Sequence, residues 1–201
     1  MSLEAALANA NASVREVVES LAHSKRIDVA GVPPGALDWM LAETAAQHPD
    51  TKLVVVAPNL DEAYRQESNL RFFLGDPGGD VLLYAAGDTS PLLDVVPDRS
   101  AVMQRMATLA RLVEESDWRV LIVPAAALPR RIPPRDYVRN SLITVARGTS
   151  LDRDDLVERL SSLGYLRVPL VEDRGTFSAR GAIVDVYAPD ARTPCRIEEA
   201  S

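Results

Sequence analysis

The sequence predicts an α/β fold in two parts: a parallel-sheet domain over residues 1–131 and a small α+β domain over residues 132–201. Apolar β-branched runs alternate with helical patterns up to the run Trp118–Val123, which is typical of a parallel sheet covered by helices. The proline- and arginine-rich segment Pro129–Pro134 then interrupts this alternation. Beyond it, short strand-like runs separated by turns favour antiparallel pairing.

The first part contains four strand-like runs, each close to a helical pattern. We expect helices where apolar residues recur every three or four positions, and strands where β-branched residues run together. The continuous apolar run KLVVVAP indicates a strand buried on both faces of the sheet. The first helix, over Leu3–Leu21, is expected to be either broken or two short helices, with a capping-box spacing at Ser13 and Glu16. The elements that follow, in chain order, are a strand at Arg26–Ala30, a helix at Leu37–Gln47, a strand at Lys52–Pro58, a helix at Leu60–Leu74, a turn at Asp76–Gly79, a strand at Asp80–Ala86, a helix at Val102–Val113 and a strand at Trp118–Val123.

The second part contains one well-marked helix among short strands. Asp152 is placed to cap the helix amino terminus, Asp155 follows at the third position, and Leu151 faces Leu156 as a hydrophobic staple. Pro169 removes one hydrogen-bond donor from the first strand after the helix, so that strand should lie at a sheet edge. The predicted elements are a strand at Leu142–Ala146, a helix at Asp152–Leu163 and strands at Leu166–Val171, Thr176–Arg180, Ala182–Tyr187 and Cys195–Ile197.

Composition limits the classes of function. With 47% hydrophobic and 25% charged residues, the chain has the composition of a soluble globular protein. No apolar run approaches 18 residues and no secretory leader is visible, so we expect a cytoplasmic location without membrane partners. Cys195 is the single cysteine, which excludes an internal disulfide, and two histidines leave little metal chemistry. We therefore expect neither a metal nor a cofactor.

Charge is distributed unevenly along the chain. The net charge of −7 divides into −9 for residues 1–118 and +2 for residues 119–201, and every basic residue in the second stretch is arginine. The acidic stretch is a poor candidate for holding nucleic acid, because phosphate binding needs concentrated basic side chains. Arginine carries a planar fork of donors that suits carboxylate or phosphate, although surface arginines can also serve solubility alone.

The segment Ala30–Leu37 lies between a predicted strand and a predicted helix, where a phosphate-binding loop would lie. Ala30 and Gly35 have the spacing of such a loop, with Gly31 between them. However, Ala36 replaces its lysine and Leu37 its hydroxyl residue, so the side chains that engage phosphate and magnesium are absent. We interpret the segment as a degenerate loop, while an NTP-binding α/β domain with an unusual loop remains an alternative.

No catalytic residue is predicted. The sequence contains no nucleophile-elbow, zinc-protease or dinucleotide-binding motif. His23 and His48 have no partner motif, and both are interpreted as surface or capping residues. Cys195 has no histidine near it in sequence and is interpreted as an inert, buried thiol.

The second candidate site is an arginine group in the C-terminal strands. Strand alternation places Ser178 and Arg180 on one face and Phe177 on the other. Arg167 projects from a neighbouring strand and Arg174 lies on the turn before Gly175. Arginines fixed on a sheet suit docking of an acidic partner. Internal pairing of these arginines is the alternative, and the available carboxylates are Glu172, Asp173 and Asp185.

Several segments, in order, resemble the N-terminal, UvrB-like region of the bacterial transcription-repair coupling factors. The most specific is Gly164–Tyr187, where GYLRV is followed at a fixed distance by GTFSARGAIVDVY. The other matching segments are RFFLGD at Arg71–Asp76, SAVMQRMATLARL at Ser100–Leu112, VPAAALPRRIPPRDY at Val123–Tyr137 and RIE at Arg196–Glu198. The resemblance spans roughly Leu21 to Glu198.

This resemblance implies a fold and a partner. It implies that the first domain is a degenerate P-loop domain of the RecA/helicase-like kind, and that the second is a small α+β domain of the UvrA-binding type. Carried over by position, Arg167, Arg174, Phe177 and Arg180 would bind UvrA, the damage-recognition protein of nucleotide excision repair. Ser178 stands where UvrB has another arginine.

The resemblance also implies that the chain is the front end of a longer protein. Contacts with RNA polymerase and DNA, and ATP-dependent translocation, would belong to the missing domains. The chain itself would be a non-catalytic module that recruits UvrA. A further alternative is an intramolecular clamp, in which the arginine face contacts C-terminal domains of the full-length protein and holds its ATPase inactive.

Overall fold

The computed structural model describes residues 3–21, 23–75, 79–85, 99–114, 117–148 and 151–198. The chain divides into two units, Met1–Leu83 with Asp117–Leu128, and Tyr84–Ser116 with Pro129–Ser201. This division differs from the expected boundary at residues 131 and 132 because helix α4 (Arg99–Val113) groups with the C-terminal residues. Across the described ranges, no helix is both long and apolar enough to cross a membrane.

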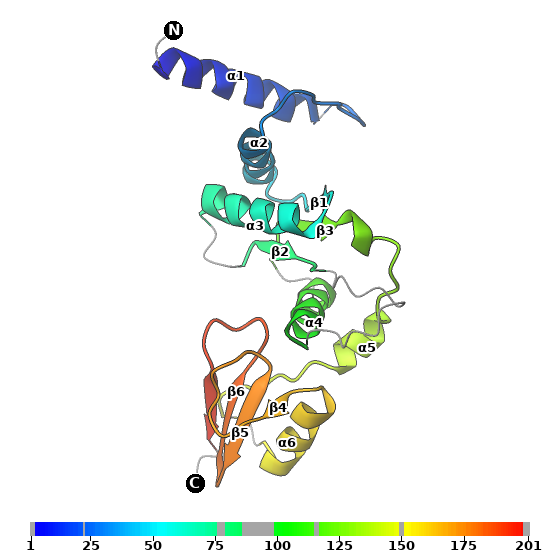
Figure 1. The fold of residues 1–201 in the computed structure, drawn as a ribbon, viewed down its shortest axis with the longest axis vertical. Coiled ribbons are helices and arrows are strands. Elements are labelled where there is room, and N and C mark those ends of the chain that lie inside the picture. Colours follow the sequence, from blue (N-terminus) through cyan, green and yellow to red (C-terminus); the bar gives the residue numbers. More distant parts are fainter. Residues whose placement is uncertain are drawn as a thin grey trace. The chain divides into compact units, whose positions relative to one another are not determined.

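A three-stranded parallel sheet lies at the centre of the first unit. Strand β3 (Val120–Pro124) runs between β1 (Leu53–Ala57) and β2 (Val81–Leu83) and is parallel to both. Helix α3 (Leu60–Leu74) connects β1 to β2 and packs beside the sheet (Figure 1). The 3₁₀ turn η1 (Ala125–Ala127) follows β3. The prediction of a parallel sheet with helical connections is therefore confirmed.

Helix α3 has the limits expected from the sequence because both of its ends are capped. At its start, the Asn59 side chain accepts a hydrogen bond of 2.8 Å from the backbone N–H of Glu62. At its end, Gly75 adopts a left-handed conformation with φ of 61°. Glycine is the residue that most readily takes this conformation. The expected turn at Asp76–Gly79 lies mostly outside the described residues.

The two preceding helices pack through a small apolar cluster. Val14 and Val18 of α1 (Leu3–Leu21) contact Met40 of α2 (Pro34–Gln47). Helix α1 is continuous, so the break expected near Ser13 is wrong. Beyond Ser13 its apolar residues Val14 and Val18 pack against α2, and this tertiary packing outweighs a local capping pattern.

A buried carboxylate joins α2 to α3. Asp38 is fully buried, and its Oδ2 accepts hydrogen bonds of 2.6 Å from both Arg65 and Asn69. Burial of a charge is costly unless it is paired and hydrogen-bonded, and these two donors on one helix face supply that compensation. The ion pair therefore fixes the packing of α2 against α3.

Two expectations for the first unit are wrong. Residues 26–30 form no strand, and Val29 is 45% exposed. Strand β1 is buried on one face only, since Val54 and Val56 are 59% and 51% exposed while Ala57 is fully buried. Successive residues of a strand point to opposite faces, and the alternating burial of β1 shows that one of its faces is packed while the other is open to solvent.

The second unit contains a four-stranded sheet in the order β4-β5-β6-β7. Its strands are β4 (Leu166–Arg167), β5 (Thr176–Arg180), β6 (Ile183–Tyr187) and β7 (Cys195–Glu198), and its helices are α4, α5 (Arg135–Asn140) and α6 (Arg153–Ser162). Strand β4 pairs with β5 in parallel, whereas the other neighbours are antiparallel. The separate, mainly antiparallel sheet agrees with the predicted α+β character.

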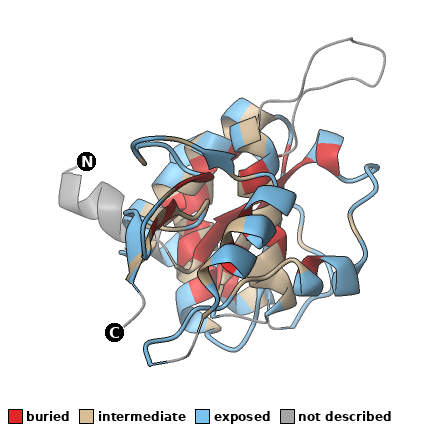
Figure 2. Cartoon of the chain, turned by 90° about the horizontal axis from the view of Figure 1, so that it is seen from below, coloured by how far each residue is buried: buried red, intermediate tan, exposed pale blue. Residues whose placement is uncertain are grey.

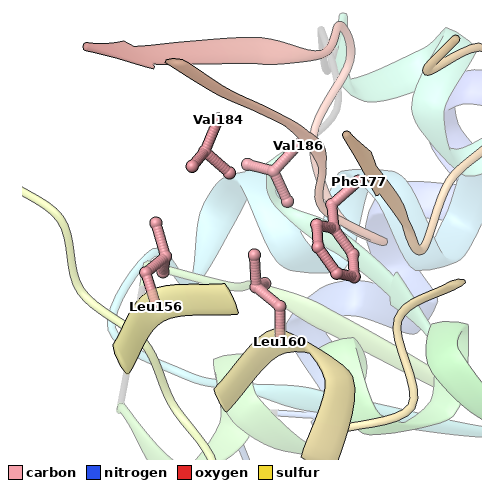
Figure 3. Packing of buried hydrophobic residues seen from close by; sticks show 5 residues of the cluster. All are labelled: Leu156, Leu160, Phe177, Val184 and Val186. Carbon is pink, nitrogen blue, oxygen red and sulfur yellow. The ribbon is translucent and has the colours of Figure 1, made fainter. Parts of the chain in front are cut away.

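One helix covers one face of this sheet. Leu156 and Leu160 of α6 point toward Phe177, Val184 and Val186, and all five side chains are buried (Figure 3). The Asp152 side chain caps α6 as predicted, because its Oδ1 accepts from the N–H groups of residues 154 and 155 at 2.8 and 3.1 Å. Buried residues are concentrated on the strands and the inner faces of the helices (Figure 2).

Residues 142–146 are irregular, so the predicted strand at Leu142–Ala146 is wrong. A strand needs a neighbour to satisfy its backbone groups. Within the described residues, neither sheet gives residues 142–146 a neighbouring strand, because the two sheets consist of β1 to β3 and of β4 to β7. Residues 144–148 are accordingly exposed.

Two glycines on either side of β4 fix the contact of α4 with the C-terminal residues. Gly164 and Gly175 have positive φ angles of 86° and 72°. The guanidinium of Arg99 donates to the carbonyl oxygens of both, at 3.3 and 3.0 Å. The Met103 side chain lies where a Cβ atom on Gly175 would be. Both glycines belong to the segment that carries the family resemblance, and backbone conformation explains their presence.

We expect Phe177→Ala to lower the free energy of unfolding of the second unit by about 3–5 kcal/mol, because it leaves a cavity under α6. Native-state hydrogen exchange at β5 and β6 amides measures this loss. Phe72→Ala is the matched control, since Phe72 is 80% exposed and its removal should cost under about 0.5 kcal/mol. Equal effects of the two substitutions would contradict the assignment of the core.

We expect Gly175→Ala to destabilise the second unit more than Gly181→Ala. Both positions have positive φ, which costs an alanine about 1–2 kcal/mol. Only Gly175 also meets Met103, whereas nothing lies within 4 Å of a Cβ at Gly181. Thermal unfolding of the two variants tests this difference, and a G181A variant as unstable as G175A would contradict it.

Candidate functional site

The candidate site lies where the β4–β5 pairing ends. The N–H groups of Leu166 and Val168 donate to the carbonyl oxygens of Gly175 and Phe177, at 3.0 and 2.8 Å. Alternate residues donate to β5, so the N–H position of residue 169 faces away from β5 and Pro169 there removes no ladder bond. Strand β4 is two residues long. Strand β4 lies at the sheet edge, as predicted from Pro169.

Two of the predicted arginines bridge the strands at this point. Arg167 donates through Nη2 to the carbonyl oxygen of Ala179 at 3.4 Å, and Arg180 donates through Nη2 to the carbonyl oxygen of Pro169. Both side chains belong to exposed residues. A guanidinium has five N–H donors, so one bond to a carbonyl leaves most of its donors for another acceptor. The geometry therefore holds two arginines in place at the edge without using up their donor capacity.

Arg174 lies on the turn that leads into β5. Its guanidinium is 5.9 Å from the centre of the Tyr187 ring, which is a cation–π contact at the outer limit of distance. The Tyr187 hydroxyl donates to the carbonyl oxygen of Arg192 at 2.8 Å, which fixes the ring. We call Arg167, Arg174 and Arg180 the arginine edge.

The arginine edge is not neutralised by internal ion pairs. Within the described ranges, none of its three arginines lies within ion-pair distance of a carboxylate. The alternative, in which they pair with Glu172, Asp173 or Asp185, is therefore wrong for the described residues. Asp185 instead pairs with an arginine on a different strand.

That partner is Arg196 of β7, which faces Asp185 across the β6–β7 pair. The two side chains form a bidentate pair, with Nε–Oδ1 and Nη2–Oδ2 distances of 2.7 and 3.0 Å. Hydrogen bonding to Arg196 lowers the pKa of Asp185 below its ordinary value, and the charge of Arg180 acts in the same direction. Sequence inspection alone missed this pair, which only the strand register could have identified.

The structure corrects one predicted site residue. Phe177 is fully buried in the cluster under α6 (Figure 3), so its side chain cannot touch a partner in this conformation. Ser178, where UvrB has an arginine, is also buried, at 5% exposure.

Cys195 is exposed, so the expectation of a buried thiol is wrong. Partial desolvation nevertheless raises the pKa of this thiol above its ordinary value. Among the described residues, no group of three or more His, Cys, Asp or Glu could hold a metal ion.

The residues of the degenerate loop do not form a phosphate cradle. Ala30 and Gly31 lie in an irregular segment, whereas Gly35, Ala36 and Leu37 belong to the first turn of α2. Pro34 has no N–H group, and the N–H groups of residues 36 and 37 both donate to the carbonyl oxygen of Pro33, at 3.0 and 3.1 Å. At this helix start the N–H of residue 34 is therefore missing and those of residues 36 and 37 are engaged.

Comparison with known proteins supports the family assignment. Residues 143–200 match the family model described as UvrB interaction domain. The chain is 35% identical over 189 residues to a transcription-repair-coupling factor of Myxococcus xanthus, covering 91% of this chain and 16% of that protein. It is 28% identical to the factors of Escherichia coli and Bacillus subtilis, over 79% and 82% of this chain.

The resemblance to the N-terminal region of transcription-repair-coupling factors is confirmed. The chain spans 13–16% of the length of these three relatives. All residues of the arginine edge lie inside the UvrB interaction domain match, whereas the degenerate loop lies outside it. The region similar to this domain is therefore the region that presents the exposed arginines.

Loss of the Arg196 partner should raise the pKa of Asp185. The pKa of Asp185 is lower in the folded state than in the unfolded state. Its pair with Arg196 therefore stabilises the fold above the unfolded-state pKa of Asp185, and this contribution is lost as the pH falls through the lower, folded-state pKa. In Arg196→Ala, an NMR titration of the Asp185 carboxyl carbon should show a higher midpoint than in the wild type. An unchanged midpoint would rule out Arg196 as the cause.

Proposed function

We propose that the chain is a non-catalytic docking module that recruits UvrA to stalled RNA polymerase in transcription-coupled nucleotide excision repair. The observation that carries this proposal is the arginine edge, which lies within the match to the UvrB interaction domain. UvrA is the partner that the family resemblance implies. Contacts with RNA polymerase and DNA, and ATP-driven movement, are assigned to other parts of the longer relatives.

The chemistry of the arginine edge supports docking of an acidic surface. Arg167 and Arg180 are restrained by bonds to Ala179 and Pro169, so binding orders them little further and costs little side-chain entropy. Their remaining N–H groups can donate to both oxygens of a carboxylate. Arg174 adds a third charge on the turn next to them.

The first unit supports a role without nucleotide chemistry. The helix start where a phosphate would bind has Ala36 and Leu37 where a phosphate loop has a lysine and a hydroxyl residue, and the N–H groups of these two residues are engaged by Pro33. We propose that this unit is a degenerate nucleotide-binding fold that serves as a scaffold.

The proposal is tested by measuring UvrA affinity for the wild type and for the double variant Arg167→Ala and Arg180→Ala. Loss of one bidentate anchor should cost about 2 kcal/mol or more, which is roughly a thirtyfold weaker affinity. Arg192→Ala is the matched control, because Arg192 is equally exposed and lies on the β6–β7 connection instead of the edge. It should bind UvrA as the wild type does.

Unchanged affinity in the double variant would refute the site. Absence of UvrA binding by the wild-type chain would refute the proposed function itself. Circular dichroism of each variant checks that its fold is retained.

A further inference from the structure

Two exposed leucines flank the arginine edge along the chain. Leu166 is the first residue of β4 and Leu170 follows Pro169, and these leucines are 54% and 66% exposed. No other leucine, isoleucine or valine in the described part of the chain is as exposed as Leu170. Single exposed apolar residues are common on soluble proteins, so what distinguishes these two is their place beside restrained arginines.

The backbone pairing brings both leucines close to Arg180. Leu166 is opposite Thr176 in the β4–β5 register, and strand alternation puts Thr176 on the same face of β5 as Arg180. The Arg180 guanidinium donates to the carbonyl oxygen of Pro169, and this carbonyl belongs to the peptide group that leads into Leu170. Arg180 therefore lies beside the backbone of Leu170 and shares a face of the sheet with Leu166.

Charge alone gives this surface little net attraction for an acidic partner. The turn between β4 and β5 carries the exposed carboxylates Glu172 and Asp173, so the three arginines of the arginine edge exceed these carboxylates by one. Ion pairs exposed to solvent are weak, because water and salt screen both charges. Stable docking through the arginine edge therefore requires a contact that keeps water away from its ion pairs.

We infer that Leu166 and Leu170 supply this contact and are buried against UvrA, an inference that rests on the proposed function. Apolar side chains that exclude water lower the local dielectric constant and so strengthen the ion pairs next to them. The partner surface that fits is an apolar patch bordered by carboxylates. Both leucines lie within residues 143–200, the same match to the UvrB interaction domain that contains the arginine edge.

The test compares the UvrA affinity of the wild type with that of the double variant Leu166→Ser and Leu170→Ser. Because burying two leucines is strongly favourable, the double variant should bind at least about tenfold more weakly. Leu128→Ser is the matched control, because Leu128 is 59% exposed and belongs to the first unit. It should bind UvrA as the wild type does. Leu166→Met with Leu170→Met keeps the apolar volume and should also retain the affinity.

Salt separates the leucine contact from the arginine contact. Raising the salt from about 0.1 M to about 1 M shortens the Debye length from about 10 Å to about 3 Å and weakens exposed ion pairs. The loss of affinity caused by the two serine substitutions should persist at the higher salt. The loss caused by Arg167→Ala with Arg180→Ala should become smaller.

Wild-type affinity in the leucine double variant, or an equal loss in Leu128→Ser, would overturn this inference and leave the proposed function standing. Disappearance of the leucine effect at about 1 M salt would overturn it as well, because an apolar contact is not screened. Absence of UvrA binding by the wild-type chain would overturn both the inference and the proposed function. Circular dichroism of each variant verifies that the exposed substitutions leave the fold intact.

Discussion

The packing of α6 on one face of the C-terminal sheet determines which strand residues of the second unit form its core. Leu156 and Leu160 cover Phe177, Val184 and Val186, so this face of the sheet becomes the core. Successive residues of a strand point to opposite faces, and the intervening polar residues are therefore turned away from α6. Strand β4 ends after Arg167, and the arginine edge forms where its pairing with β5 stops.

The arginines of this unit serve three different purposes. Arg99 donates to the carbonyl oxygens of two positive-φ glycines and so joins α4 to the residues on either side of β4. Arg196 neutralises Asp185 in a bidentate pair. In the described part of the chain, Arg167 and Arg180 are bound through backbone carbonyls and not to a carboxylate, which restrains them without cancelling their charge. Restrained but unneutralised arginines are what docking of an acidic surface requires.

Local patterns predicted the elements that carry their own signals. The capped limits of α3, the Asp152 cap of α6 and the strands β5 and β6 follow from side chains close in sequence. Residues 26–30 and 142–146 have strand-like composition but no neighbouring strand, and neighbours are set by tertiary structure. The arginines could be located from the sequence. The burial of Phe177 and the pairing of Arg196 with Asp185 depend on register and on α6, which no local pattern reveals.

Hydrogen exchange of the chain with and without UvrA tests the central claim most directly, because it maps the docking surface without substitutions. The account predicts that UvrA slows exchange of the backbone amides in residues 165–182, around the arginine edge, and leaves β1 and β3 unaffected. Slower exchange confined to the first unit, with residues 165–182 unchanged, would contradict it.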